Sequence, residues 1–168
     1  MANPPLYAPW RMDYIRAIDK PDTGCFLCEA ATCPPEEFRQ RLILWRTESV
    51  VVMMNRYPYT NGHILVAPLT HTAEFDALSE PVLLDIHQQT AGAVRLLKRA
   101  VSAQGFNIGI NVGRVAGAGV PGHLHQHVVP RWAGDTNFIS VVGEVRIVPQ
   151  AMTQLYDELM AGVEGVRG

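Results

Sequence analysis

Three histidines at alternate positions, His123, His125 and His127, are the residues of this 168-residue chain best suited to chemistry. Alternate residues of a β-strand point to the same face, so the run HLHQHVV predicts three imidazoles on one side of a strand. Imidazole is a good nucleophile near neutral pH, and three such rings are poor core filling because each carries a donor and an acceptor. The spacing therefore predicts a reactive site on this strand.

Two simpler interpretations compete with this one. Three solvent-exposed strand histidines would have no chemical role. A single metal ion bound by all three is disfavoured, because side chains four residues apart on a strand stand about 13 Å apart whereas metal–nitrogen bonds are about 2.1 Å long. The geometry favours divided roles for the three rings.

A second set of candidate ligands lies near the N-terminus. Cys25 and Cys28 have the short spacing at which two thiolates share one metal ion, and Cys33 is a third thiol nearby. An odd number of cysteines in a chain that we expect to be cytoplasmic argues against a disulfide framework. A closed metal site would need two more ligands, so a pair of free loop cysteines stays open as the alternative.

The composition limits the class of protein. Of the residues, 48% are hydrophobic and 18% are charged, as in one globular domain with a substantial core. The formal net charge is -2 and no lysine or arginine run exceeds a pair, so nucleic-acid and anionic-membrane partners are not expected. No secretory signal pattern or apolar stretch of about 20 residues is present, so we expect a cytoplasmic protein.

The pattern of residue types predicts an α+β domain with an antiparallel five-stranded sheet, one long helix and a C-terminal helix. Apolar β-branched runs and a hairpin-like Asn-Gly turn predict strands at 41–46, 50–56, 63–67, 106–112 and 123–130, with a short edge strand at 145–149. Helical spacing and capping residues predict helices at 9–18, 79–103 and 149–162, and Pro, Thr and Asp predict a loop at 21–36.

The residues around the histidine run carry a family resemblance. The run from His123 to Val129 resembles the signature of the histidine-triad (HIT) family, although Gln126 occupies a position that is usually apolar. Upstream, NRYPYTNGHILVAP (55–68) is similar to the family's nucleoside-binding strand pair, and NVGRVAGAG (111–119) to its phosphate loop. HVVPRWAGDTNF and APWRMDYI are similar to bacterial HIT proteins related to diadenosine tetraphosphate phosphorylases.

The resemblance covers roughly residues 41–138 and implies a single HIT domain over 1–168. In that division, 1–40 hold an N-terminal helix and the CxxC loop, 41–138 hold the core with the nucleotide site, and 149–162 form the C-terminal helix. It also implies a homodimer whose two sheets join.

The same resemblance implies an enzyme that cleaves dinucleoside polyphosphates at the α-phosphate through a nucleotidyl-histidine intermediate. His125 would attack phosphorus, while His127 and His63 would donate hydrogen bonds to phosphate oxygens. The implied substrate contacts are Asn55 at the ribose and Asn111, Gly117, Ala118 and Gly119 at the phosphates. For each asparagine alone, a turn cap is the alternative. Many relatives carry Gln, Ser or Thr in this loop, so the substrate preference stays open.

A structural zinc ion is implied as well. In a subset of the family, the CxxC pair joins a histidine after the G-H-x-L-V strand and the first histidine of the triad. The matching residues here are Cys25, Cys28, His71 and His123, a closed Cys₂His₂ set. Cys33 would then be a spare thiol, and His87 an ordinary helix histidine.

Two further functions stay open beside hydrolysis or phosphorolysis of dinucleoside polyphosphates. Hydrolysis of nucleoside phosphoramidates needs the same nucleophile with a different leaving group. A nucleotide-binding regulator needs no turnover, since a site can bind nucleotide without accelerating a reaction.

Overall fold

The computed structural model describes residues 24–135 and 150–166. The helix expected at 9–18 and the edge strand expected at 145–149 lie outside these ranges.

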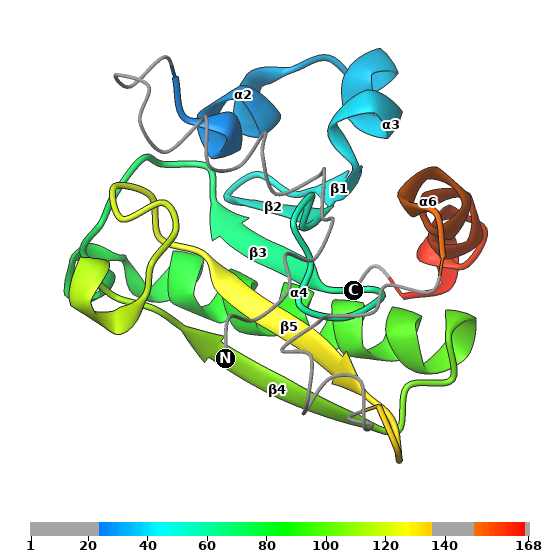
Figure 1. The fold of residues 1–168 in the computed structure, drawn as a ribbon. Helices are drawn as coiled ribbons and strands as arrows, with labels where there is room; N and C mark the ends of the chain where they lie inside the picture. Colours follow the sequence, from blue (N-terminus) through cyan, green and yellow to red (C-terminus); the bar gives the residue numbers. More distant parts are fainter. Residues whose placement is uncertain (1–23, 136–149, 167–168) are drawn as a thin grey trace, which may run out of the picture.

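Five antiparallel strands form one sheet in the order β1-β2-β3-β5-β4 (Figure 1). The strands are β1 (Ile43–Arg46), β2 (Val50–Met54), β3 (Ile64–Pro68), β4 (Gly105–Ile110) and β5 (Gln126–Arg131). Every residue of β2 and β3 is buried, which explains why these strands are apolar throughout and do not alternate. The expected α+β fold with an antiparallel five-stranded sheet is confirmed.

The long helix α4 (Glu80–Ala100) runs along one face of the sheet, behind it in the view of Figure 1. It begins after Ser79 with a proline in its first turn, and it buries Ile86, Ala93, Leu96 and Leu97 against the sheet. The C-terminal helix α6 (Met152–Met160) buries Leu155, Tyr156 and Leu159 in the same cluster. None of the helices in the described ranges has the length and apolar character needed to cross a bilayer.

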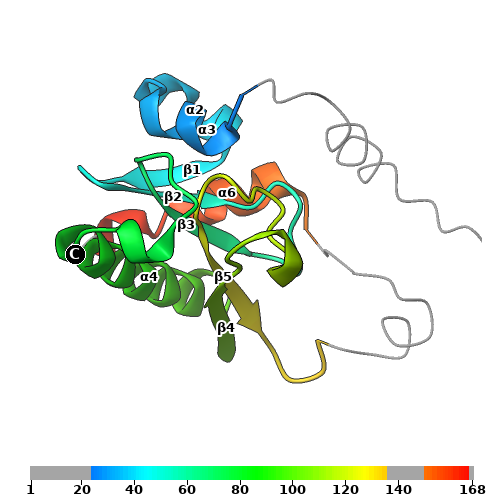
Figure 2. The ribbon, with the colours of Figure 1, turned by 90° about the vertical axis from the view of Figure 1, so that its left-hand side faces the viewer.

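The opposite face of the sheet carries a smaller apolar cluster beneath the helix α2 (Phe26–Thr32), which Figure 2 shows on the other side from α4. Leu27 and Ala30, three residues apart on one side of α2, are fully buried there. Arg46 donates from its guanidinium to carbonyls at the end of this helix, those of Ala30, Ala31 and Cys33.

The prediction of a loop at 21–36 is therefore wrong for much of that range. It contains α2 and the 3-10 turn η1 (Pro35–Glu37), which leads into the short helix α3 (Phe38–Arg41). A seven-residue helix shows too few turns for helical periodicity to stand out, and its stability comes from burial against the sheet.

Gln126 faces α4, away from the histidine face, as its position in the strand predicts. Its side chain is buried, and its Nε2 donates to the hydroxyl of Thr90, which in turn donates to the carbonyl of Ile86. The polar residue in a usually apolar position is thus matched by a hydrogen-bonding residue on the helix that covers it.

Candidate active site and metal cluster

The register of the sheet brings the expected catalytic histidines together. His127 of β5 lies opposite Leu65 of β3 on one side and Gly109 of β4 on the other. His63 is two residues before Leu65 and so on the same face, with its Nε2 3.0 Å from Nδ1 of His127. The ring of His125 also lies beside His127, with the two ring centroids 4.9 Å apart.

The start of β5 divides the triad. The strand begins at Gln126 rather than at residue 123, so His123 and His125 precede it. His123 is fully buried beside Cys28 of α2 and Cys25 at its N-terminal cap, whereas the rings of His125 and His127 lie next to each other. The structure therefore separates one ring of the triad from the other two.

The hydrogen bonds around His63 fix the tautomer of His127. The backbone N–H of Tyr59 lies 3.1 Å from Nδ1 of His63, and the amide Nδ2 of Asn55 lies 3.2 Å from the same atom. The orientation of the Asn55 amide is set because its Oδ1 accepts from the N–H of Tyr57. Since both groups at Nδ1 are donors, His63 carries its hydrogen on Nε2 and donates it to Nδ1 of His127. The hydrogen of His127 is then on Nε2.

This tautomer places two hydrogen-bond donors side by side. Nε2 of His127 lies 3.5 Å from Nδ2 of Asn111, and both nitrogens carry hydrogens. Two donors this close can share one oxygen acceptor, such as a non-bridging phosphate oxygen. Gly109 lies directly opposite His127 and leaves space beside that ring, since a Cβ at residue 109 would meet nothing within 4 Å.

His125 has the opposite arrangement, with its Nε2 left as the lone-pair atom. Its Nδ1 lies 2.8 Å from the backbone carbonyl of His123, which can only accept, so the hydrogen is on Nδ1. Burial lowers the pKa of His125 below its ordinary value, and burial together with the neighbouring His125 lowers the pKa of His127 to about 4. Both rings are therefore neutral at neutral pH, and His125 presents a nucleophilic nitrogen.

The loop between β4 and β5 contributes fewer free amides than expected. Its tight turn is built on Gly113 and Gly117, whose φ angles of 82° and 89° favour glycine. The N–H groups of Gly117 and Ala118 donate to carbonyls inside this turn. Within the described residues, the N–H of Gly119 makes no such backbone hydrogen bond.

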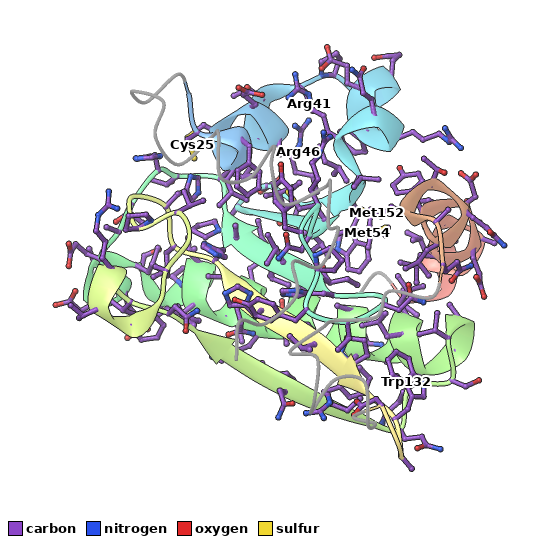
Figure 3. All side chains as sticks on the ribbon, viewed as in Figure 1. Cys25, Arg41, Arg46, Met54, Trp132 and Met152 are labelled. Carbon is purple, nitrogen blue, oxygen red and sulfur yellow. The ribbon has the colours of Figure 1, made fainter. Side chains whose placement is uncertain are left out.

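The four expected metal ligands meet at the start of α2. Sγ of Cys25 lies 3.2 Å from Nδ1 of His123, Sγ of Cys28 lies 3.1 Å from Nδ1 of His71, and all four ligand atoms are within 4.8 Å of one another. Figure 3 shows Cys25 at this end of the helix. Cys33 lies apart, buried with its thiol directed at the carbonyl of Ala30.

This cluster fits a tetrahedral metal ion. Bonds of about 2.0–2.3 Å would place the ligand atoms about 3.3–3.8 Å from one another, close to the separations between sulfur and nitrogen in the cluster. Nε2 of His123 lies 2.9 Å from the carbonyl of Pro68, so it carries the hydrogen and leaves the lone pair of Nδ1 toward the two sulfurs.

Three contributions to the site were not anticipated. The ring of Tyr59 stacks on His63 with centroids 4.7 Å apart, a contact across a turn that left no signal in the sequence. Gly109 of β4 lies opposite His127, and Asn111, which directly follows β4, has its amide beside the same histidine. The carbonyl of Pro68 left no sequence signal, because every residue has one.

The HIT domain family matches residues 38–134, more than half of the chain. The chain belongs to the HIT family. An AP-4-A phosphorylase of Mycobacterium tuberculosis is 33% identical over 151 residues, which cover 88% of this chain and 77% of that protein.

Two more HIT relatives are similar over different lengths. An asymmetrical bis(5'-nucleosyl)-tetraphosphatase of Schizosaccharomyces pombe is 31% identical over 93 residues, 55% of this HIT chain and 50% of the yeast protein. A solved structure of a Zn-bound histidine triad family protein from Mycobacterium smegmatis has a TM-score of 0.67 at 25% identity and covers 84% of this chain and 94% of that one.

The buried neutral histidines predict that acid destabilises the fold. In the unfolded chain, the side chain of residue 127 binds a proton below the ordinary histidine pKa of 6.5. In the folded chain, His127 stays unprotonated until about pH 4. Stability should therefore be complete above pH 6.5 and fall as the pH is lowered from 6.5 to 4, since the unfolded state binds more protons there. Urea unfolding at a series of pH values measures this slope. The slope should be shallower in His127→Asn, and an identical slope in that variant would contradict the assignment.

Proposed function

We propose that the chain is a HIT hydrolase or phosphorylase that cleaves dinucleoside polyphosphates, such as diadenosine tetraphosphate, at the α-phosphate. The observation that carries the proposal is the hydrogen bond from His125 Nδ1 to the His123 carbonyl, which leaves a neutral Nε2 lone pair beside the donors of His127 and Asn111. The names of the mycobacterial phosphorylase and the yeast tetraphosphatase support the substrate class.

The reaction has two displacements at one phosphorus. Nε2 of His125 forms a bond to the α-phosphorus as the bond to the leaving phosphate oxygen breaks, which gives a nucleotidyl-imidazole. The ring keeps its Nδ1 hydrogen and becomes positively charged, and the carbonyl of His123 stabilises that charge. Water, which loses a proton to the solvent, or inorganic phosphate then attacks phosphorus, the phosphorus–nitrogen bond breaks, and its electron pair returns to Nε2.

The neighbouring residues stabilise the charge on the phosphate oxygens. His127 Nε2 and Asn111 Nδ2 donate to a non-bridging oxygen, together with the N–H of Gly119. Both ring nitrogens of His63 have protein partners, so His63 acts as a positioning residue that keeps the donor hydrogen of His127 on Nε2. Asn55 donates one amide hydrogen toward His63 and accepts from the N–H of Tyr57 with one oxygen lone pair. Its second amide hydrogen and second lone pair are the groups that would bind the ribose hydroxyls.

Product analysis tests this function. Diadenosine tetraphosphate should yield AMP and ATP by hydrolysis, or ADP and ATP when inorganic phosphate is the acceptor. His125→Gly should lose turnover by at least about a thousandfold while still binding the dinucleotide, because it removes the attacking atom and spares the donors. His87→Ala, a change at an exposed residue of α4, is the matched control and should keep the full rate.

Each other outcome contradicts a stated part of the proposal. A normal rate in His125→Gly would overturn the nucleophile. Cleavage of an adenylylated amine without cleavage of the dinucleotide would favour the phosphoramidate hydrolase. Binding of both without any product would favour the nucleotide-binding regulator.

We propose further that the ion held by Cys25, Cys28, His71 and His123 is zinc. Two thiolates and two imidazoles are a ligand set typical of structural zinc, and four protein ligands leave no position open for substrate. The zinc-bound relative from Mycobacterium smegmatis supports the choice.

Metal analysis checks the ion. The purified protein should contain about one zinc per chain, and a chelator should lower its melting temperature because the bound ion stabilises the folded state. Cys28→Ser should reduce the zinc content, whereas Cys33→Ser should not, since Cys33 lies outside the cluster. Wild-type protein without bound metal, or loss of zinc in both variants, would count against the assignment.

A homodimer stays a prediction. β4 is the last strand on its side of the sheet within the described residues, and Ile108 on it is 50% exposed. An apolar side chain on an open strand edge suits pairing with a second copy. The single-domain assignment over 1–168, the cytoplasmic location and the lack of nucleic-acid and membrane partners likewise stay predictions.

A further inference from the structure

We propose that the metal cluster positions the catalytic nucleophile: the ion bound at Nδ1 of His123 holds in place the backbone carbonyl that keeps His125 in its reactive tautomer. The inference rests on the function proposed above. It assigns the ion a part in orientation beyond stabilising the fold.

Three polar atoms of His123 connect the two sites. Its Nδ1 faces the sulfurs of Cys25 and Cys28 at 3.2 and 3.5 Å, and its Nε2 donates to the carbonyl of Pro68. Its own carbonyl accepts from Nδ1 of His125 at 2.8 Å. Because ring and carbonyl belong to one fully buried residue, fixing the ring restricts the carbonyl.

The backbone around His123 depends on the same cluster. The N–H of Leu124 donates to the carbonyl of Thr72 at 2.7 Å, and Thr72 follows His71, another of the four ligands. An ion shared by His71 and His123 therefore ties together the two segments that this backbone hydrogen bond joins. The regular pairing of β5 starts only at Gln126, so the strand ladder does not hold the carbonyl of His123.

Loss of the ion should be a local event. Helix α2 remains attached to the sheet through the burial of Leu27 and Ala30 against Val51 and Leu65, which needs no metal. An ion would hold the two cysteines to His71 and His123 by metal–ligand bonds, which are stronger than the thiol–imidazole hydrogen bonds that the same atoms can make without it. Without it, the fold should persist while the loop that carries the His123 carbonyl becomes less constrained.

A less constrained carbonyl changes the chemistry of His125. A neutral imidazole places its hydrogen on either nitrogen, and a fixed acceptor behind one nitrogen selects the tautomer. When that acceptor moves, part of the population carries the hydrogen on Nε2 and has no lone pair toward phosphorus. Metal loss should therefore lower kcat more than it raises KM.

Histidine-labelled protein tests the connection directly. Long-range ¹H–¹⁵N correlation spectra of the full chain, assigned with His125→Gly, report which nitrogen of His125 carries the hydrogen. The samples are native protein, protein treated with EDTA in the presence of a reductant, and the variant Cys28→Ser, with Cys33→Ser as the matched control that keeps all four ligands. Rates with diadenosine tetraphosphate are measured on the same samples.

We expect native protein and Cys33→Ser to show His125 protonated on Nδ1 alone. The EDTA-treated protein and Cys28→Ser should show both tautomers and a kcat lowered at least about tenfold, and added zinc should restore the EDTA-treated protein. A folded metal-free protein that keeps the native tautomer, or the native kcat, would overturn the proposal. If EDTA unfolds the chain, the native protein is compared instead with Cys28→Ser in the presence of zinc, which keeps three of the four ligands. Failure of every sample to cleave the dinucleotide would contradict the proposed function, while the tautomer populations still decide the positioning.

Discussion

The hydrogen bond from Nδ1 of His125 to the carbonyl of His123 is the interaction on which the site depends. A neutral imidazole offers one lone pair, and this bond places the lone pair on Nε2. Burial favours the neutral ring by lowering its pKa, so the proposed nucleophile needs no base to activate it. The same burial makes the bond necessary, since a buried N–H without a partner is costly.

Two residues later, the sheet gives His127 the opposite tautomer, with its hydrogen on Nε2. The pairing of β3 with β5 sets His63 diagonally next to His127, and the N–H of Tyr59 makes Nδ1 of His63 an acceptor. One neighbouring histidine thereby has a lone pair on Nε2 and the other a hydrogen on Nε2, although both are neutral imidazoles on one face. Their different roles come from the groups behind the rings.

The part of the site that depends on strand periodicity was predictable from the sequence. Alternation placed His125 and His127 on one face and Gln126 on the other, and the runs of β-branched residues gave β1 to β3. The long helix followed from its apolar spacing, and the family resemblance gave the four residues of the metal cluster.

Features that depend on tertiary contacts were not predictable in this way. Helix α2 was missed because its stability comes from the burial of Leu27 and Ala30, which no seven-residue window reveals. Strand β5 starts later than expected because His123 turns toward the cysteines. The tautomers depend on backbone groups of Tyr59, Pro68 and His123, which sequence does not distinguish from any other backbone group.

The most direct measurement of the central claim is the capture of the covalent intermediate. A phosphorus–nitrogen bond is labile in acid but persists in alkali, so an alkaline quench during turnover of diadenosine tetraphosphate preserves a nucleotidyl-imidazole. Intact mass measurement should show a fraction of chains heavier by one nucleotidyl group, located at His125 in the peptide that contains HLHQH. If quenching throughout the approach to steady state never finds this adduct, in wild type or in His127→Ala, the assignment of Nε2 of His125 as the nucleophile is contradicted.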